Sequence, residues 1–213
     1  MDLNGDGIAD VTSGQYWPGI ITFFEGSQTG LKKGEVIPEV GVEQAKTNDM
    51  RFAQSTASFV DWDGDGDLDM LIGSVFGGIL ININEGTPKQ FKFGQRVPLM
   101  AAGKPMKVAA SKSDPLCVDW DGDGVLDILS GDDSGGVGFF RGIKPTAGNA
   151  RTFEAPVPVI PGKMKNIVPG FRARLAVADW NNDGKLDLLV GNCEQTTGLK
   201  PELTGYVYLF MRK

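Results

Sequence analysis

Short apolar stretches alternate with polar, glycine-rich segments along the whole chain. The clearest stretches cover residues 58–60, 69–73, 116–118 and 186–191, and several of them end in glycine. Runs of a few apolar residues bounded by turn-forming residues are typical of β-strands rather than of helices. The pattern therefore predicts an all-β chain built from short antiparallel strands.

One nine-residue pattern, Asp-x-Asp/Asn-x-Asp-Gly-x-x-Asp, occurs four times in the polar segments. The copies read DLNGDGIAD, DWDGDGDLD, DWDGDGVLD and DWNNDGKLD, and we name them loop 1 (2–10), loop 2 (61–69), loop 3 (119–127) and loop 4 (179–187). Their starts lie 59, 58 and 60 residues apart. A nearly constant period indicates a repeat protein whose units share one structure.

The spacing of oxygen atoms in these loops is typical of a calcium site. Calcium takes six to eight oxygen ligands in a flexible shell, and a short loop with oxygens on alternate residues can surround it. Positions 1, 3, 5 and 9 offer side-chain oxygens, position 7 offers its backbone carbonyl, and glycine at position 6 permits the sharp turn. About four Ca²⁺ ions per chain are therefore expected. The predicted ligands are Asp2, Asn4, Asp6, Ile8 and Asp10; Asp61, Asp63, Asp65, Asp67 and Asp69; Asp119, Asp121, Asp123, Val125 and Asp127; and Asp179, Asn181, Asp183, Lys185 and Asp187.

Two other interpretations of the loops are less favoured. An EF-hand requires a bidentate Glu at position 12 and flanking helices, whereas position 12 here holds Ser13, Ile72, Ser130 and Val190. A solvated acidic turn at the end of a hairpin would explain one isolated copy equally well. Four copies in register favour the metal sites.

The remainder of each period predicts further strands. The strand after each loop ends at Gly14, Gly73, Gly131 or Gly191. A second β-rich run follows at 20–24, 79–83, 137–140 and 206–210, and a fourth strand is expected at 33–37, 91–97 and 153–160. Each full unit would be four antiparallel strands, which bury both faces of their sheet only by stacking against neighbours, as in a β-propeller.

The loops, the glycine-ended strand and the Gly-Gly-x-apolar strand after it resemble the FG-GAP/VCBS repeat family. This family forms the calcium-loop propeller blades of integrin α-subunit heads and of many secreted bacterial proteins. The resemblance covers essentially the whole chain and implies one β-propeller domain, 1–213, with repeats at about 1–38, 55–97, 115–160 and 174–213. It also implies a ring of about seven blades, with calcium loops on one face and ligand contacts on the other.

This chain departs from the family in size. Its strands are expected as three, four, four and three, so that the first and last blades are incomplete. We expect an open arc or part of a longer propeller, with the natural N-terminus missing. The alternatives are a homodimer of two chains that closes an eight-unit ring and an unusually small ring.

The acidic loops account for the charge of the chain, and their expected calcium dependence predicts its location. The loops hold 15 of the 27 acidic residues, so the net charge of −6 reflects the metal sites. Loops of this kind fill reliably where calcium is near millimolar, which predicts an extracellular or periplasmic location. No segment has the apolar length of a membrane span, and no basic stripe with interleaved aromatics suggests nucleic acid. Cys117 and Cys193 are expected at opposite faces, which disfavours a disulfide.

The sequence favours a binding module over an enzyme. Without histidine, Ser-His and Cys-His nucleophile pairs are excluded, and the serine-containing segment 131–136 is interpreted as a turn. We therefore expect a calcium-stabilised module that binds carbohydrate or an extracellular protein. The alternative is an extracellular polysaccharide-acting enzyme, or its scaffold, with Asp132 and Asp133 or Glu194 and Glu202 as weak carboxylate candidates.

Candidate ligand contacts lie in the loops expected opposite the calcium sites. Trp62, Trp120 and Trp180 share position 2 of their loops, so they are expected to pack between neighbouring blades. The connectors 38–54, 98–114 and 161–173 combine Lys and Met, and long loops on a rigid scaffold often carry binding. The predicted ligand-binding residues are Tyr16, Trp17, Lys46, Arg51, Lys104, Lys107, Lys163 and Lys165.

Overall fold

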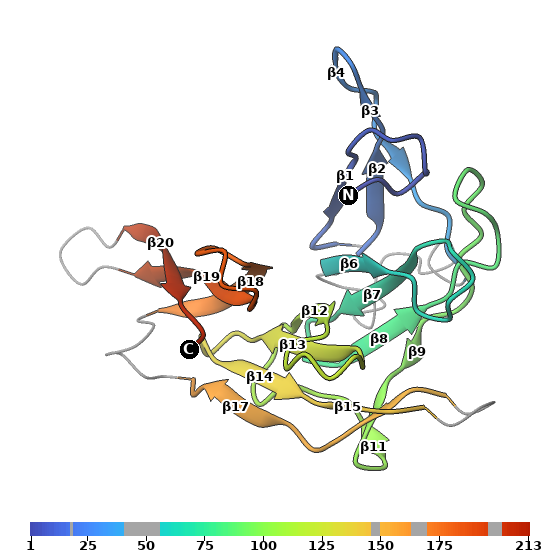
Figure 1. The fold of residues 1–213 in the computed structure, drawn as a ribbon. Coiled ribbons are helices and arrows are strands. Elements are labelled where there is room, and N and C mark those ends of the chain that lie inside the picture. Colours follow the sequence, from blue (N-terminus) through green and yellow to red (C-terminus); the bar gives the residue numbers. More distant parts are fainter. Residues whose placement is uncertain (18, 41–55, 146–149, 163–169, 196–201) are drawn as a thin grey trace.

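The protein is built from small antiparallel β-sheets (Figure 1). The computed structural model describes residues 1–213 except for 18, 41–55, 146–149, 163–169 and 196–201. The described residues contain strands, turns and irregular segments but no helix, and therefore no helix that could cross a membrane. Four larger sheets, one for each repeat, carry the loops, and we number them in chain order.

Each repeat sheet is formed by consecutive strands of its own repeat. The first sheet has the order β1-β2-β5, with strands Val11–Gly14, Ile21–Phe24 and Glu35–Val36. The second has the order β6-β7-β8-β9, with strands Thr56–Val60, Asp69–Gly73, Ile79–Asn82 and Val97–Pro98. The third has the order β12-β13-β14-β17, with strands Asp114–Val118, Asp127–Gly131, Val137–Phe140 and Val157–Ile160. The fourth has the order β18-β19-β20, with strands Phe171–Ala178, Asp187–Gln195 and Leu203–Phe210. The distribution of three, four, four and three strands agrees with the prediction.

Two smaller sheets were not predicted. One is the hairpin of β3 (Gly26–Ser27) and β4 (Gly30–Leu31). The other has the order β11-β10-β16-β15, with strands Lys104–Pro105, Met100–Ala101, Thr152–Phe153 and Gly142–Ile143. It joins the second repeat to the third through the parallel pairing of Ala101 with Phe153. The segment 98–114 is therefore not a simple connector.

The predicted fourth strands are only partly formed. β5 and β17 lie within the expected ranges, whereas most of 91–97 is not a strand and β9 begins only at Val97. Phe93 in this segment makes isolated bridges to Glu39 and Asn84 and is buried. Its side chain belongs to the core between the first and second sheets, so packing rather than strand pairing holds the segment.

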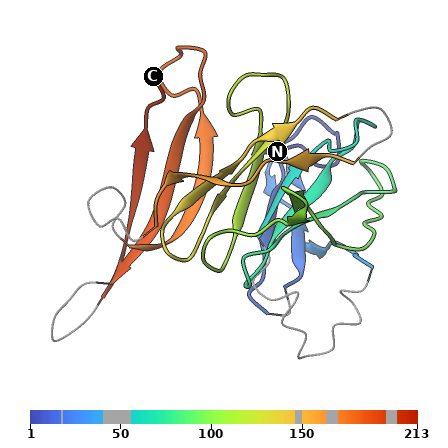
Figure 2. The ribbon, with the colours of Figure 1, turned by 90° about the horizontal axis from the view of Figure 1, so that it is seen from below.

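Three hydrophobic clusters fill the spaces between successive sheets. Met70 and Leu71 illustrate the alternation, because Met70 packs in the cluster shared with the first sheet and Leu71 in the cluster shared with the third. A third cluster joins the third sheet to the fourth through Leu129 and Leu188. All residues of β7 and β13 are consequently buried. Figure 1 shows the sheets in sequence order around an open centre, and Figures 1 and 2 both show the first and fourth sheets apart.

Glycine at the end of the second strand allows the next sheet to approach closely. A Cβ atom at Gly73 would collide with the carbonyl oxygen of Ser113, and one at Gly131 would collide with that of Ala173. Hydroxyl groups reinforce the first of these junctions, since Ser58 Oγ donates to the Pro115 carbonyl at 3.0 Å. Glycine at these two positions is therefore a packing requirement between sheets.

A buried ion pair joins the first two repeats. Arg96 and Glu39 are both almost fully buried, and the Arg96 guanidinium binds both carboxylate oxygens at 2.8 and 2.7 Å. Asn82 Nδ2 donates to the same carboxylate at 2.9 Å, and Arg96 also donates to the carbonyl of Gly19 at 3.1 Å. Charged hydrogen bonds of this geometry compensate the burial of both ions.

Candidate metal centres

Loops 2, 3 and 4 are closed by the strands of their hairpins. The last residue before each loop pairs directly with its ninth residue: Val60 with Asp69, Val118 with Asp127 and Ala178 with Asp187. In loop 1 the Asp10 N–H donates to the Met1 carbonyl at 2.5 Å. The hairpins thus hold loops 2, 3 and 4 at the same place in their sheets, and a single backbone hydrogen bond closes loop 1.

The ninth aspartate of each loop is a buried structural clamp. Its Oδ2 accepts the N–H of position 2, at 2.8 Å for Leu3 and Asp10, 2.8 Å for Trp62 and Asp69, 2.9 Å for Trp120 and Asp127, and 3.0 Å for Trp180 and Asp187. Its Oδ1 accepts an N–H from beyond the third strand, that of Gly26, Asn84, Gly142 or Arg212, at 2.7 to 2.8 Å. Analysis of the sequence missed this role, although a strand begins at or directly after each of these residues.

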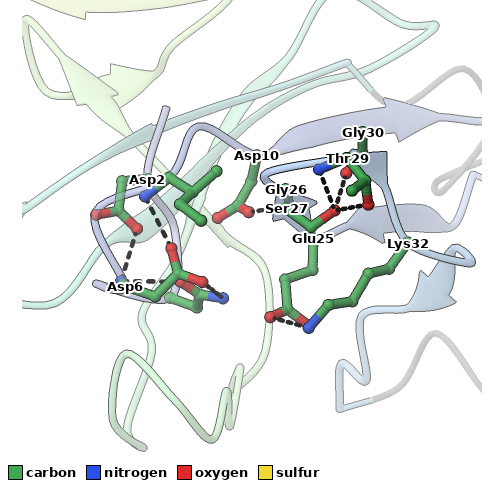
Figure 3. Close-up of polar contacts among 11 residues, drawn as sticks. Asp2, Asp6, Asp10, Glu25, Gly26, Ser27, Thr29, Gly30 and Lys32 are labelled. Carbon is green, nitrogen blue, oxygen red and sulfur yellow. Dashed lines mark hydrogen bonds and ion pairs between the residues drawn. The ribbon is translucent and has the colours of Figure 1, made fainter.

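The first and fifth residues shape the exposed part of each loop. Position 1 accepts the N–H of the glycine at position 6, at 2.8 Å in loop 1 and at 3.2, 2.9 and 2.9 Å in loops 2 to 4. Position 5 accepts the N–H of position 7 at 2.8 to 3.0 Å in all four loops. Figure 3 shows Asp2 and Asp6 on the same loop, with Asp10 pointing toward Gly26. The four loops therefore share one hydrogen-bonding scheme.

Carboxylate oxygens converge in loops 2 and 3. Those of Asp61, Asp63 and Asp65 lie within 4.8 Å of one another, as do those of Asp119, Asp121 and Asp127. Hard oxygen donors at this separation suit a calcium ion. Each carboxylate oxygen has a second lone pair, so accepting a backbone N–H does not prevent an oxygen from also binding a cation.

Loops 1 and 4 have asparagine at position 3 and are less acidic. Asn4 Nδ2 donates to Asp6 at 3.4 Å, and Asn181 Nδ2 donates to Asp183 at 3.0 Å. The bond from Asn181 is the main cause of the lowered pKa of Asp183. Their amide oxygens remain suitable calcium ligands.

Asp67 in loop 2 provides a direct test of whether a cation fits. The sequence assigned only its backbone carbonyl to the metal, but its side chain is buried and Oδ1 has no hydrogen-bond partner among the described residues. Burial, followed by the neighbouring carboxylates, raises the pKa of Asp67 to about 6. A buried acceptor without a donor is costly. Such an atom beside three converging carboxylates fits a bound cation.

Comparison with protein families agrees with this repeated geometry. The family model for the FG-GAP-like repeat matches residues 2–72 and 119–190. The chain belongs to the FG-GAP-like repeat family. No curated protein and no solved structure gave a significant match.

Loop 3 of this FG-GAP-like chain carries its own basic partner. Arg141 lies just beyond β14 and its guanidinium contacts Asp121 at 2.6 Å and Asp123 at 3.3 Å. A guanidinium on two of the predicted calcium ligands competes electrostatically with a metal ion. In loop 3, therefore, a bound cation and the Arg141 guanidinium would compete for the same carboxylates.

The tryptophans at position 2 of the FG-GAP-like loops differ in burial. Trp62 is buried against Phe153 of the next repeat, with ring centroids 6.0 Å apart. Trp120 packs at the edge of the cluster shared with the fourth sheet and lies 5.0 Å from the Arg212 guanidinium. Trp180 is exposed. The predicted packing between repeats is confirmed for Trp62 and Trp120 and is wrong for Trp180.

The predicted ligand-binding residues do not form one described cluster. Tyr16 and Trp17 are exposed in the connection between β1 and β2. Lys104 is exposed in β11, and Lys107 lines a cavity of about 230 Å³ beside β14 and β17. Lys46, Arg51, Lys163 and Lys165 lie outside the described residues.

The carboxylates considered for catalysis have structural partners. Asp132 is buried, and its carboxylate accepts the N–H groups of Ser134, Gly136 and Ala110, which fixes the predicted turn at 131–136. Asp133 pairs with Lys112 at 2.9 Å.

The described cysteines and the second pair of carboxylates add no site. Cys117 and Cys193 are both free. Burial raises the pKa of the Cys117 thiol to about 12, which leaves it unreactive. Glu194 and Glu202 belong to the β19 and β20 region, where the backbone carbonyl of Glu194 accepts the Thr204 hydroxyl at 3.3 Å.

Proposed function

We propose that this chain is a calcium-stabilised β-propeller module that acts outside the cell and binds carbohydrate or another protein. The ions have a structural role, one in each loop. The observation that supports this most strongly is the single hydrogen-bonding scheme that recurs in all four loops. Four unrelated acidic turns would not be expected to form the same set of hydrogen bonds.

Electrostatics gives each ion a stabilising effect. Loop 2 contains five aspartates within nine residues, and burial, together with its neighbours, already raises the pKa of Asp67. Unit charges about 4 Å apart interact by roughly 1 kcal/mol in water and more where they are partly buried. A divalent cation among these carboxylates replaces repulsion with attraction, and an ion that binds only the folded state raises its stability.

Native mass spectrometry combined with calorimetric titration of calcium tests the metal sites. The wild-type chain is expected to bind four Ca²⁺ ions per chain. Asp63→Ala and Asp121→Ala remove position 3 ligands that make no buried clamp, so each should lose or weaken one ion. Glu154→Ala changes an exposed acid outside the loops and serves as the control. Fewer than three ions on the wild-type chain would contradict the proposal.

The exposed aromatic pair favours ligand binding by the connections between strands. Tyr16 and Trp17 are both exposed, and aromatic rings with a polar edge stack on sugars or anchor protein partners. Screening against a glycan array and pull-down from extracellular protein fractions would identify the ligand. Tyr16→Ala with Trp17→Ala should weaken capture at least tenfold, while Phe76→Ala, at another exposed aromatic position, should leave it unchanged. Equal capture by both variants would exclude this surface.

A binding role is preferred over an enzymatic one because the candidate carboxylates are engaged. Asp132 accepts backbone N–H groups, and Asp133 forms an ion pair. Incubation of the calcium-loaded protein with polysaccharides tests the choice. Release of products that Asp133→Asn abolishes would replace the binding module with a hydrolase.

A further inference from the structure

Among the described residues, the two sheets at the ends of the arc each leave one face uncovered, and the two faces correspond to the two sides of the junction that recurs between repeats. We call the face of a sheet that is turned toward the next repeat its later face, and the face turned toward the preceding repeat its earlier face. Within the chain, the later face of one sheet packs on the earlier face of the next in each of three hydrophobic clusters. In the part of the chain that the structure describes, no sheet packs on the earlier face of the first sheet or on the later face of the fourth (Figure 1).

Equivalent positions on the later face show what is uncovered on the fourth sheet. The residue paired with the glycine of the second strand is Ile21, Ile79 or Val137 in the first three repeats, and each is buried between sheets. Its equivalent in the fourth repeat, Val207, pairs with Gly191 and is 72% exposed. The same face is therefore core in three repeats and surface in the fourth.

Trp180 repeats this contrast at position 2 of its loop. It is 60% exposed, whereas Trp62 at the same position is 7% exposed because the next repeat covers it. Leu209 also lies on the uncovered face, because it alternates with the inward-packed Phe210 and Tyr208, and it is exposed. Contiguous apolar surface of this kind marks an interaction site.

The earlier face of the first sheet is also exposed at positions that are buried in the other repeats. The residue directly after the ninth aspartate is Met70, Ile128 or Leu188 in the later repeats, and each is buried against the preceding sheet. Its equivalent, Val11, is 46% exposed. Val36 lies on the same side, through its pairing with Thr22, and is exposed as well.

We propose that two copies of this chain associate head to tail, with the fourth sheet of each packed on the first sheet of the other. The occupant is a second copy because its first sheet presents the surface that each later face already accepts within the chain. Surfaces that differ on the two partners close into a ring when the rotation between copies permits. Two arcs of four repeats give eight sheets, within the known range of propellers.

One part of the junction would remain open in this dimer. At Gly73 and Gly131 the backbone of the next sheet's first strand fills the space above glycine, whereas at Gly191 no atom of another repeat lies within 4 Å. The described first sheet starts at β1, which is equivalent to the second strand of the other sheets. A shallow groove lined by Arg172, Arg174 and Gly191 would therefore face the centre of the ring.

Analytical ultracentrifugation and native mass spectrometry in calcium test the association. At ~50 μM, above the dissociation constant expected for an interface of standard size, the wild-type chain should be a dimer. Val207→Glu and Val11→Lys should each give monomers, because a charge would be buried at both junctions. Val97→Glu, an equally exposed valine on β9 of the second sheet, is the matched control and should remain dimeric.

Mixing the two monomeric variants provides the decisive test of head-to-tail association. A mixed dimer has one junction with Lys opposite Glu and one junction of wild-type type, so dimers should return on mixing. Circular dichroism of each variant verifies that it is folded. A monomeric wild-type chain, open-ended oligomers, or a dimer that both charged variants leave intact would overturn the proposal. A wild-type monomer that still binds four calcium ions would overturn the association while leaving the proposed metal role standing.

Discussion

Aspartates at different positions of one loop have different structural roles. The carboxylate of Asp127 binds the backbone N–H groups of Trp120 and Gly142 in a buried setting. Asp121 in the same loop contacts Arg141 at the surface. Asp127 therefore supports the fold without any cation, whereas Asp121 would contribute mainly through the proposed calcium ion.

Replacing these two residues separates the roles. Asp127→Ala leaves two backbone donors without their acceptor, and each buried unsatisfied group costs roughly 1–3 kcal/mol. We expect a loss of about 2–4 kcal/mol in the free energy of unfolding with metal removed. Asp121→Ala should change the metal-free stability by less than about 0.5 kcal/mol, as surface substitutions usually do. Urea denaturation of both variants in chelator measures the difference, and equal losses would refute the distinction.

Asp67 makes the stability of the metal-free protein depend on pH. Its pKa is about 6 in the folded state against an ordinary value of 3.8. The folded state therefore binds more protons between these values, and stability should increase as the pH falls from 7 toward 4. Other acids titrate in the same range, so the informative quantity is the difference between wild type and Asp67→Asn.

The expected result is that Asp67→Asn stabilises the metal-depleted protein at pH 7 and has little effect at pH 4. The asparagine carries no charge into the cluster, so the penalty of the buried carboxylate is removed. Differential scanning calorimetry at both pH values should show the melting temperature of the variant about 2–8 °C higher at pH 7 only. A variant that melts at the wild-type temperature at pH 7 would show that the Asp67 carboxylate is solvated.

At the scale of the elements, glycine decides where one sheet can approach the next. Gly131→Ala should destabilise the protein by more than 2 kcal/mol, because its Cβ would collide with the backbone of Ala173 in β18. Gly191→Ala is the matched control, since the nearest atoms to its Cβ lie 3.9 Å away on Arg174 of the same sheet. Thermal unfolding of the two variants measures the contrast. Equal destabilisation would mean that the cost arises within the strand rather than between sheets.

The junction of the first two repeats contains the buried ion pair of Arg96 and Glu39, and removing one partner leaves the other charge buried without compensation. Arg96→Met would remove the guanidinium and leave the Glu39 carboxylate buried with Asn82 as its neighbour. Breaking a buried pair from one side costs about 3–5 kcal/mol. The double variant Glu39→Gln with Arg96→Met should recover part of this loss. Urea titrations of the single and double variants give the coupling, and strictly additive losses would contradict a direct interaction.

Local patterns predicted the hairpins well because a loop and its two strands lie within about twenty residues. The strand pairing of Val60 with Asp69 and the glycine-ended strand follow from that short-range pattern. Long-range pairing was not predictable in the same way. The bridge of Ala101 to Phe153 and the ion pair of Arg96 with Glu39 join residues more than fifty positions apart. Nothing in either local segment specifies its partner.

Within the loops, too, the sequence pattern predicted some roles of the residues and not others. The period and the oxygen positions indicated metal sites, and two aspartate triads do converge. The clamp role of Asp69 was hidden, because a residue that accepts backbone N–H groups and one that binds calcium carry the same carboxylate. The exposure of Trp180 was hidden as well, since it depends on a neighbour rather than on the repeat itself.

At the scale of the whole molecule, the proposed calcium sites and the cores between sheets depend on one another. Each sheet is too small to bury its faces alone, so the cores between sheets require every hairpin to be closed correctly. The strand that begins at the ninth residue of loops 2, 3 and 4 contributes to such a core, and loop 1 contributes Leu3 directly. Loss of an ion from a loop should therefore reduce the stability of the complete structure rather than of one hairpin.

Removal of calcium is expected to lower the melting temperature by well over 10 °C. An ion present at a hundredfold excess over its dissociation constant contributes about 2.7 kcal/mol, so the four proposed ions together would contribute about 11 kcal/mol. Each kcal/mol corresponds to roughly 2–4 °C in melting temperature for a domain of this size. Calorimetry in calcium, in chelator and in magnesium at equal concentration measures the effect. Magnesium should restore little of the stability, because it requires octahedral geometry and loses its water reluctantly. Full restoration by magnesium or by sodium chloride at the same ionic strength would mean that screening of the loop carboxylates, rather than specific ion binding, stabilises the fold.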